Sequence, residues 1–231
     1  MHRIFFMVII CIIPFAASTQ DTLNVTDLSG FRQGRWKKFD SVGHLLYEGQ
    51  FRNNLPVGTF RYFYPTGEIK TVLVYSDTSK TAAVTSYFRN SRKMAVGWYK
   101  DEKKEGLWQF FSEKDGSLAS EENFRQGKKE GLSRVFYPDG TLAETSIWKE
   151  GLLDGPSEQF YTDGKLKLRV TYLEGEKHDA FTSWFPDGKV MISGKYYKGH
   201  PDGEWLYYNE AGQRIRWEKY NQGQLMESIE N

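Results

Sequence analysis

The segment from Gly131 to Asp154 reads GLSRVFYPDGTLAETSIWKEGLLD, and its pattern recurs along almost the whole chain. The recurrence has a period of 24 residues, with a single step of 25. The eight opening positions are Gly34, Gly58, Ala82, Gly106, Gly131, Gly155, Asp179 and Gly203. A fixed period of this length is typical of tandem-repeat proteins, in which each unit packs mainly against its neighbours. The sequence therefore predicts eight units.

Two columns of this repeat are aromatic in every unit. The first, five residues after the opening position, contains Phe39, Phe63, Tyr87, Phe111, Phe136, Phe160, Trp184 and Tyr208. The second contains Phe51, Tyr75, Tyr99, Phe124, Trp148, Tyr172, Tyr196 and Tyr220. A third column, two residues after the opening position, is aromatic in some units only. Because a buried ring removes about 150–250 Å² from water, we expect the sixteen invariant aromatic residues to hold the array together.

Turn motifs divide each unit into two short strands. The motif reads YPTG at Tyr64, YPDG at Tyr137, YTDG at Tyr161 and FPDG at Phe185. Proline presets φ, aspartate hydrogen-bonds within the turn and glycine accepts positive φ, so the motif predicts a tight β-hairpin. The 25-residue step falls at this turn in the fourth unit, where an extra residue shifts no strand register.

The second strand of each unit alternates as a sheet strand should. In the sixth unit Leu166 and Val170 share one face, and Lys167 and Arg169 share the other. In the first strand the aromatic columns are three residues apart, which requires a bulge or strong twist to bring them into one core. The predicted fold is all-β: an elongated, twisted antiparallel meander of about eight tandem 24-residue β-hairpin repeats.

The ends of the chain differ from the array. Residues 1–20 combine His2 and Arg3, an apolar run and small residues, which is typical of a secretory signal peptide. An uncleaved N-terminal anchor is the alternative. We expect residues 21–33 to form an N-terminal cap, 34–226 the repeat array and 227–231 a C-terminal tail. The protein is then exported, as a periplasmic, outer-surface or secreted protein.

Composition excludes several functional classes. Without Arg3 the chain has 30 basic and 30 acidic residues, whereas nucleic-acid binders normally carry a basic excess. Cys11 is the only cysteine and lies in the signal segment, so we expect no disulfide and no cysteine-bearing metal site. Nucleophile-elbow, phosphate-loop and two-histidine zinc motifs are missing. We therefore expect no enzymatic activity, no catalytic residues and no cofactor.

Three sets of polar residues have both a structural and a functional interpretation. His178, Asp179, His200 and Asp202 offer metal-binding groups, and Asp115, Asp139, Asp163 and Asp187 form a carboxylate column that could bind calcium. Lys103, Lys104, Lys128, Lys129 and Lys177 form a basic rim that could contact anionic lipid. We favour solvated connectors for the first and third sets and turn hydrogen bonds for the second, and so expect no metal site.

Aromatic residues outside the repeat columns are the candidate binding residues. A single-layer sheet leaves one face partly open, and exposed aromatic patches often mark binding sites. These residues are Tyr62, Tyr64, Phe88, Phe110, Tyr197 and Tyr207. Their expected partner is another protein, with a membrane surface as a weaker alternative. A glycan stacked on Trp36, Trp108 or Trp205 is a further alternative, and the oligomeric state is left open.

The repeat resembles the MORN-repeat variant family, which includes YwqK-type antitoxin-like repeat proteins. The resemblance rests on Gly-x-Trp-x-x-Phe openings such as that at Gly34, on the turn at Asp139 and Gly140, and on the aromatic-x-x-Gly close at Trp148. The third unit departs most, at Ala82, Val84, Ser91 and Lys93. The resemblance implies an elongated hairpin array that contacts proteins or membrane surfaces. We expect an exported, non-enzymatic protein-binding scaffold, with a toxin–antitoxin or immunity role as the alternative.

Overall fold

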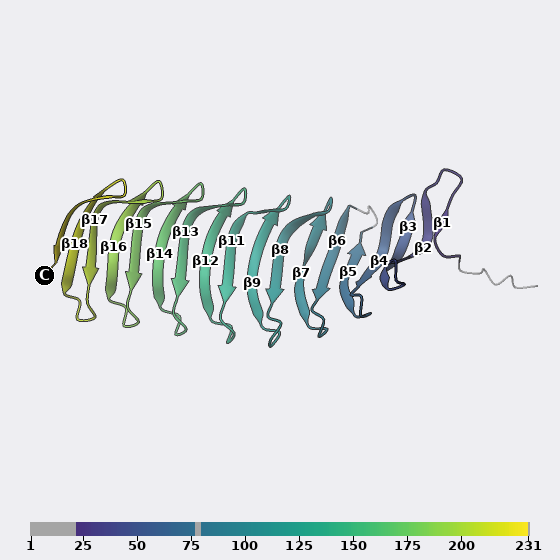
Figure 1. Cartoon of the computed structure of the whole chain (residues 1–231), viewed down its shortest axis with the longest axis horizontal. Coiled ribbons are helices and arrows are strands. Elements are labelled where there is room, and N and C mark those ends of the chain that lie inside the picture. Colours follow the sequence, from purple (N-terminus) through teal and green to yellow (C-terminus); the bar gives the residue numbers. More distant parts are fainter. Residues whose placement is uncertain (1–21, 77–79, 231) are drawn as a thin grey trace, which may run out of the picture.

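The chain folds into one long antiparallel β-sheet. The structure is a computed structural model and describes residues 22–76 and 80–230, which contain nineteen strands. Figure 1 shows them side by side in a single layer. In chain order the strands are β1 (Val25–Thr26), β2 (Arg32–Phe39), β3 (Leu45–Arg52), β4 (Leu55–Phe63), β5 (Ile69–Tyr75), β6 (Thr81–Tyr87), β7 (Lys93–Lys100), β8 (Lys103–Phe111), β9 (Leu118–Arg125), β10 (Lys128–Lys129), β11 (Gly131–Phe136), β12 (Leu142–Lys149), β13 (Leu152–Phe160), β14 (Leu166–Leu173), β15 (Glu176–Trp184), β16 (Val190–Tyr197), β17 (His200–Tyr208), β18 (Arg214–Asn221) and β19 (Gln224–Glu230). The all-β prediction is confirmed.

The strands pair in chain order and form the eight predicted hairpins. Strand β2 pairs with β3, β3 with β4, and so on to β19, while β9 pairs with both β10 and β11. Each opening position lies in the first strand of a hairpin. The longer turn of the fourth unit, between Phe111 and Leu118, carries the inserted residue as predicted.

Every hairpin has a bulge where the aromatic spacing requires one. The register shifts immediately before the invariant aromatic residue of the first strand, for example between Val135 and Phe136 and between Gln159 and Phe160. The same shift occurs in the other six hairpins. In the third unit Ser91 takes the place of the turn glycine and keeps its positive φ of 64°. This hairpin therefore retains the common geometry despite its divergent sequence.

Connections between hairpins use a second, wider bulge at the opening position. Between β3 and β4, Gln50 pairs with Val57 but Glu48 pairs with Arg61, so Gly58 lies in the bulge with a φ of 64°. Asp179 occupies this position with a φ of 59°, a conformation that aspartate tolerates better than most residues. The opening column is therefore glycine-rich because the bulge requires positive φ.

The connection between β5 and β6 lacks this bulge. Its pairing runs without a shift from Thr71 opposite Ser86 to Tyr75 opposite Ala82. Strand β5 ends at Tyr75 and β6 begins at Thr81, one residue before the opening position, whereas β4 begins at Leu55, three residues before Gly58. Ala82 can replace glycine because it lies in a regular strand.

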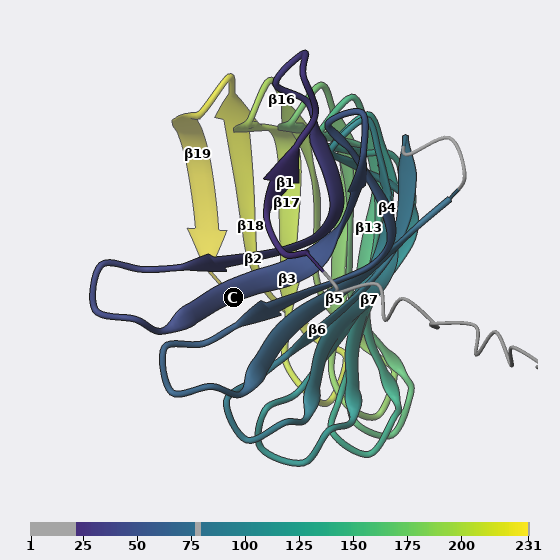
Figure 2. The same cartoon turned by 90° about the vertical axis from the view of Figure 1, so that its right-hand side faces the viewer.

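The ribbon twists most strongly near its N-terminal end. Figure 2 shows the β2–β3 hairpin lying across the hairpins behind it. Strand β2 begins within the expected cap, and β19 covers residues 224–230, most of the expected C-terminal tail. The expected signal peptide lies outside the described residues. Within residues 22–76 and 80–230, no helix is long and apolar enough to span a membrane.

Candidate functional site

One face of the ribbon carries a ladder of edge-to-face aromatic rings. It alternates between the column two residues after the opening position and the last aromatic column. Ring centroids lie 5.0–6.5 Å apart along three runs: Trp36–Phe51–Phe60–Tyr75, Tyr99–Trp108–Phe124 and Phe181–Tyr196–Trp205–Tyr220. This is the favoured geometry for aromatic pairs. The runs break at Val84 in the third unit and at Ser133 and Ser157 in the fifth and sixth.

The ladder corrects part of the prediction of which aromatic residues form the core, because the last aromatic column belongs to the ladder and the first column does not. Phe60, Trp108 and Trp205 are almost fully buried and belong to the variable column. The invariant first column lies at the bulge, where Phe39 is 52% exposed and the other seven residues are partly buried. Its backbone nevertheless joins successive units, because turn tyrosines donate hydrogen bonds to its carbonyl oxygens. The pairs are Tyr64 to Tyr87, Tyr137 to Phe160 and Tyr161 to Trp184, at 2.6–2.8 Å.

Glycines on the preceding strand make room for the buried rings. A Cβ atom added to Gly49, Gly97 or Gly194 would lie 2.3–2.4 Å from the ring of Phe60, Trp108 or Trp205, respectively. Where the ring is replaced by a small side chain, the preceding strand carries a larger residue. Leu73 precedes Val84 in this way, and Ser146 precedes Ser157. The two positions are therefore complementary in volume at these sites, whereas in the seventh unit Val170 lies opposite the ring of Phe181.

The break in the ladder at the third unit leaves an open groove of about 730 Å³. Its floor is formed by side chains of three successive hairpins, including Phe51, Phe60, Tyr62, Leu73, Tyr75, Ala82 and Tyr99. Val84, where an aromatic residue would continue the ladder, is buried beside Leu73 and Trp108. The groove thus exists because Val84 takes the place of a ring, and because Ala82 lies in a regular strand where the other units have a bulge.

The rim of the groove carries charges of both signs. Arg32 and Lys80 line it together with Asp101 and Glu102. The Arg32 guanidinium carbon lies 3.8 Å from the centre of the Phe51 ring, a cation–π contact. The groove therefore combines an apolar floor with polar groups at its margin, which is the usual composition of a binding site.

Two tyrosine hydroxyls in the groove remain protonated well above neutral pH. Burial raises the pKa of Tyr75 to about 12. Burial, followed by the neighbouring Tyr47, also raises the pKa of Tyr62. Both hydroxyls are therefore neutral hydrogen-bonding groups at physiological pH.

The opposite face of the same segment is apolar and exposed. Val74, Ala83 and Trp98 lie side by side on β5, β6 and β7, with Leu107 on β8, and we call these four residues the apolar patch. Trp98 is 55% exposed. Elsewhere this face carries charged pairs, for example Arg169 with Glu158 at 2.6 Å and Lys37 with Glu48 at 3.5 Å. The third unit is therefore unusual on both faces.

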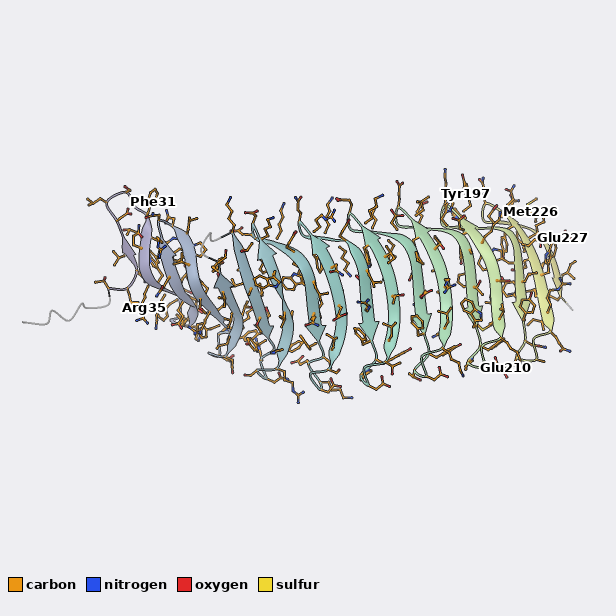
Figure 3. All side chains as sticks on the ribbon, turned by 180° about the vertical axis from the view of Figure 1, so that it is seen from behind. Phe31, Arg35, Tyr197, Glu210, Met226 and Glu227 are labelled. Carbon is orange, nitrogen blue, oxygen red and sulfur yellow. The ribbon has the colours of Figure 1, made fainter. Side chains whose placement is uncertain are left out.

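The six predicted binding aromatics do not form one site. Tyr62 lines the groove, whereas Phe110 stacks on Trp108 and the Tyr207 hydroxyl donates to Glu218 at 2.6 Å. Tyr64 and Phe88 lie at the hairpin turns, and Tyr64 is used in a hydrogen bond between units. Figure 3 shows Tyr197 on the connector edge, opposite the edge that carries Glu210. The sequence analysis did not select Leu73, Tyr75 or Trp98 as binding residues. The divergence of the third unit was the signal that could have indicated them.

The polar sets are engaged within the fold. Each column aspartate accepts a hydrogen bond from the backbone N–H two residues later, at 2.8–3.1 Å. In residues 22–76 and 80–230 no group of three or more histidine, cysteine or acidic residues could hold a metal ion. Lys104, Lys129 and Lys177 point their ammonium groups at rings of the ladder, at 4.5–5.0 Å. These three lysines are therefore not directed outward toward lipid.

Burial also overturns part of the glycan alternative. Trp108 and Trp205 are only 2% and 5% exposed. The Trp108 indole N–H donates to the carbonyl oxygen of Trp98 at 3.1 Å. A sugar ring cannot stack on either indole without unfolding part of the ladder.

Comparison with known proteins identifies the repeat. The model of the MORN repeat variant family matches residues 56–77, 129–150 and 153–174, which fall on hairpins of this sheet. No curated protein matches the sequence at a significant level.

Solved structures with similarity to parts of the chain are of much longer chains. The TarM crystal structure is 17% identical, with a TM-score of 0.30, over 39% of this chain and 18% of TarM. An S. aureus TarM mutant in complex with Fondaparinux, alpha-GlcNAc-glycerol and UDP is 16% identical, with a TM-score of 0.32, over 42% and 19%. TcdB2-TccC3-TEV is 12% identical, with a TM-score of 0.24, over 82% and 11%. The chain spans less than a fifth of each of these chains.

Proposed function

We propose that this chain, which belongs to the MORN repeat variant family, is an exported, non-enzymatic scaffold. Repeats of this family generally bind proteins or membranes. The proposed partner is another protein, which binds in the groove of the third unit. One observation carries this proposal. The third unit departs from the repeat on both faces, with the groove on one side and the apolar patch on the other. The ring is also replaced in the fifth and sixth units, by Ser133 and Ser157, but a unit that served only to extend the ribbon would keep the charged pairs on the other face.

The composition of the groove favours a peptide segment of a protein over a lipid surface. Its floor is aromatic and its rim carries Arg32 and Lys80 beside Asp101 and Glu102. A surface for anionic lipid would carry an excess of positive charge. The apolar run within residues 4–15 supports the export part of the proposal. N-terminal sequencing of the cellular protein tests that part, with a start near residue 19 expected.

Site-specific crosslinking in the native cell tests the groove directly. A photoreactive residue placed at Tyr62 should give an adduct with one defined protein. The matched control is Gln159, which occupies the same position in the sixth unit. A second pair, Trp98 and its counterpart Thr171, reports whether the partner also reaches the apolar patch. Charge reversal at the rim, Glu102→Lys, should weaken the Tyr62 adduct without unfolding the chain, because Glu102 is an exposed turn residue.

The outcomes separate the alternatives. Equal adducts from Tyr62 and Gln159 would contradict a specialised third unit, and adducts with lipid alone would indicate a membrane-binding module. Turnover of a defined substrate by the purified chain would refute the non-enzymatic assignment. An immunity role is a narrower form of the same proposal, in which the captured protein is a toxin and the chain rescues growth in the same compartment.

A further inference from the structure

Cations of the chain itself cover the ring ladder in several units. They come from the position two residues before the opening position, which we call the covering position. In the first, fourth, fifth and seventh units it carries Arg32, Lys104, Lys129 and Lys177. Each of these side chains places its charged group 3.8–5.0 Å from the centre of a ladder ring. A ring face attracts a cation, and more strongly where water is excluded, so the ladder face is a surface that holds cations.

The fourth unit shows the most complete form of this contact. Lys104 lies on β8, and its ammonium group is 4.6–4.7 Å from the centres of three rings, those of Trp108, Phe110 and Phe124. Within the described part of the chain, no carboxylate forms an ion pair with Lys104. Three rings in this arrangement are therefore sufficient to hold an ammonium group.

The second unit has the same three rings without a cation. The rings that correspond to those of the fourth unit all line the groove, and we call them the open cage: Phe60, Tyr62 and Tyr75. Pro56 occupies the covering position and pairs with Phe51, just as Lys104 pairs with Tyr99. No arginine or lysine side chain among residues 22–76 and 80–230 lies over a ring of the open cage. The backbone position of the missing cation is thus preserved, but proline cannot supply the charge.

The eighth unit shows how a missing lysine can be replaced from another strand. Pro201 occupies the covering position there, in the unit that carries the rings of Trp205, Tyr207 and Tyr220. Arg216 of β18 pairs with Tyr207, and its guanidinium carbon lies 3.9 Å from the centre of that ring. In the second unit the corresponding residue is Thr71, opposite Tyr62, and it has no charge. The open cage therefore lacks both of the cations that cover such rings elsewhere.

Acidic groups lie beside the open cage. Asp101 and Glu102 line the same groove, and neither forms an ion pair within the described part of the chain. Burial is the main cause of the raised pKa values of Tyr62 and Tyr75, and the Glu102 carboxylate raises both further. Lys80, at the covering position of the third unit, is exposed, and its ammonium group contacts no ring of the described residues. The charge of Glu102 thus acts at the rings that lack a cation.

We propose that the open cage binds a lysine or arginine side chain of the partner protein. The charged group lies over Tyr62 and Tyr75 on the side of Glu102, in the place that Lys104 takes two units later. The apolar floor of the groove suits apolar residues on either side of that cation in the partner segment. This inference rests on the proposed function for the partner being a protein, and it adds the chemistry that the groove recognises.

Binding of capped peptides to the purified full chain tests the requirement for charge. The probe is a capped Leu-Lys-Leu peptide, and its control carries uncharged norleucine in place of lysine. In NMR titrations we expect the lysine peptide to bind about tenfold more tightly, because the ring faces and a carboxylate attract the ammonium group. Glu102→Gln should weaken the lysine peptide by about two- to fivefold and leave the norleucine peptide unchanged.

Filling the cage from within the chain locates the site. Pro56→Lys puts a lysine at the backbone position that Lys104 takes on β8, so its ammonium group should cover the open cage. We expect this variant to bind the lysine peptide at least about tenfold more weakly. Pro56→Gln is the matched control, because glutamine is long but uncharged, and it should weaken binding less. Circular dichroism checks that both variants are folded, and Glu102→Gln, at an exposed turn, provides the test if they are not.

The outcomes separate this inference from the proposed function. Equal binding of the two peptides, no binding of either, or lysine-peptide binding that Pro56→Lys leaves unchanged would overturn the inference. Phosphatidylcholine vesicles that bind and are blocked by Pro56→Lys, with no binding of the lysine peptide, would overturn it in favour of a lipid headgroup. A defined protein adduct at Tyr62 together with equal binding of both peptides would retain the proposed function and reject the cation site. Selective binding of the lysine peptide without a protein adduct in the cell would do the reverse.

Discussion

Replacing Gly97 with alanine should destabilise the protein, although alanine is normally preferred to glycine in a strand. The new Cβ would lie 2.3 Å from Cδ2 and 2.4 Å from Cε2 of Trp108, where ordinary carbon contacts are about 3.5–4.0 Å. The ring would have to move by more than about 1 Å. It is held by Tyr99 at 5.1 Å, by Phe110 at 6.1 Å and by the hydrogen bond to Trp98. No flexible side chain can yield instead.

The expected size follows from two opposing effects. Overpacking of a buried site costs about 1–3 kcal/mol. An unhindered Gly→Ala change stabilises by about 0.4–1 kcal/mol through the unfolded chain. We therefore expect Gly97→Ala to lower the free energy of unfolding by about 1–2 kcal/mol.

Local opening is the appropriate measurement, because repeat arrays need not unfold in one step. Native-state hydrogen exchange of β7 and β8 reports it, alongside tryptophan fluorescence in urea. Ser146→Ala is the matched control: it occupies the same repeat position but precedes Ser157 rather than a ring. We expect this control to change stability by less than about 0.5–1 kcal/mol.

A double variant tests the proposed complementarity itself. Trp108→Val alone removes most of a buried ring and should cost about 3 kcal/mol or more. Combined with Gly97→Leu, it recreates the natural pair Leu73 and Val84. The two changes should then cost at least about 1 kcal/mol less together than the sum of the single changes. Additive costs, or a stabilising Gly97→Ala, would refute the reasoning.

Three further predictions concern the repeat framework. Tyr161→Phe removes the hydrogen bond to the Trp184 carbonyl oxygen and should cost about 1 kcal/mol in chemical denaturation; no loss would mean that water replaces it fully. Ala82→Gly restores the repeat consensus yet should destabilise by about 0.5–1 kcal/mol, because this position lies in a regular strand, and a gain in stability would contradict the assigned register. Hydrogen bonds from Ser117 lower the pKa of Asp115 to about 2 from its usual value of 3.8, so its stabilising effect should be complete above about pH 4 and be lost as the pH falls toward 2; Asp115→Asn should flatten this acid limb in pH-dependent unfolding.

Most of the fold could be predicted because the repeat shows each local requirement eight times. The Pro-Asp-Gly turns specify hairpins, and the three-residue spacing of aromatic columns in the first strand predicts the bulge that the structure shows before Phe136 and its counterparts. Local rules suffice here because every strand pairs with its neighbour in the chain.

The core could be predicted only in part, because invariance and burial do not coincide along the chain. The invariant residue Phe39 is half exposed, while the variable position that holds Trp108 in one unit and Val84 in another is buried. A signal for this was present: Gly49, Gly97 and Gly194 each precede Phe60, Trp108 and Trp205 by eleven residues. A glycine within a strand often marks close approach of another group, and here its recurrence with a ring points to the packing partner.

The groove could not be predicted because it depends on the placement of the two residues that form the wide bulge in the other connections. The step from the second to the third unit has the usual length of 24, so the sequence does not show whether the extra residues lie in a bulge or in the connection. Without the bulge at Ala82, β5 and β6 pair regularly, and no ring follows at Val84 to fill the space between Tyr75 and Tyr99.

The same change accounts for the apolar patch on the other face. Regular pairing aligns Val74, Ala83 and Trp98 across three strands, where the bulge would separate residues of the first two. No other strand of the described sheet covers this face, so Val74 and Trp98 are about half exposed there. One departure from the repeat thus creates both candidate contact surfaces. Inserting the bulge at this connection, by shortening residues 76–80 and placing glycine at Ala82, should therefore weaken both surfaces together while leaving the other seven hairpins intact.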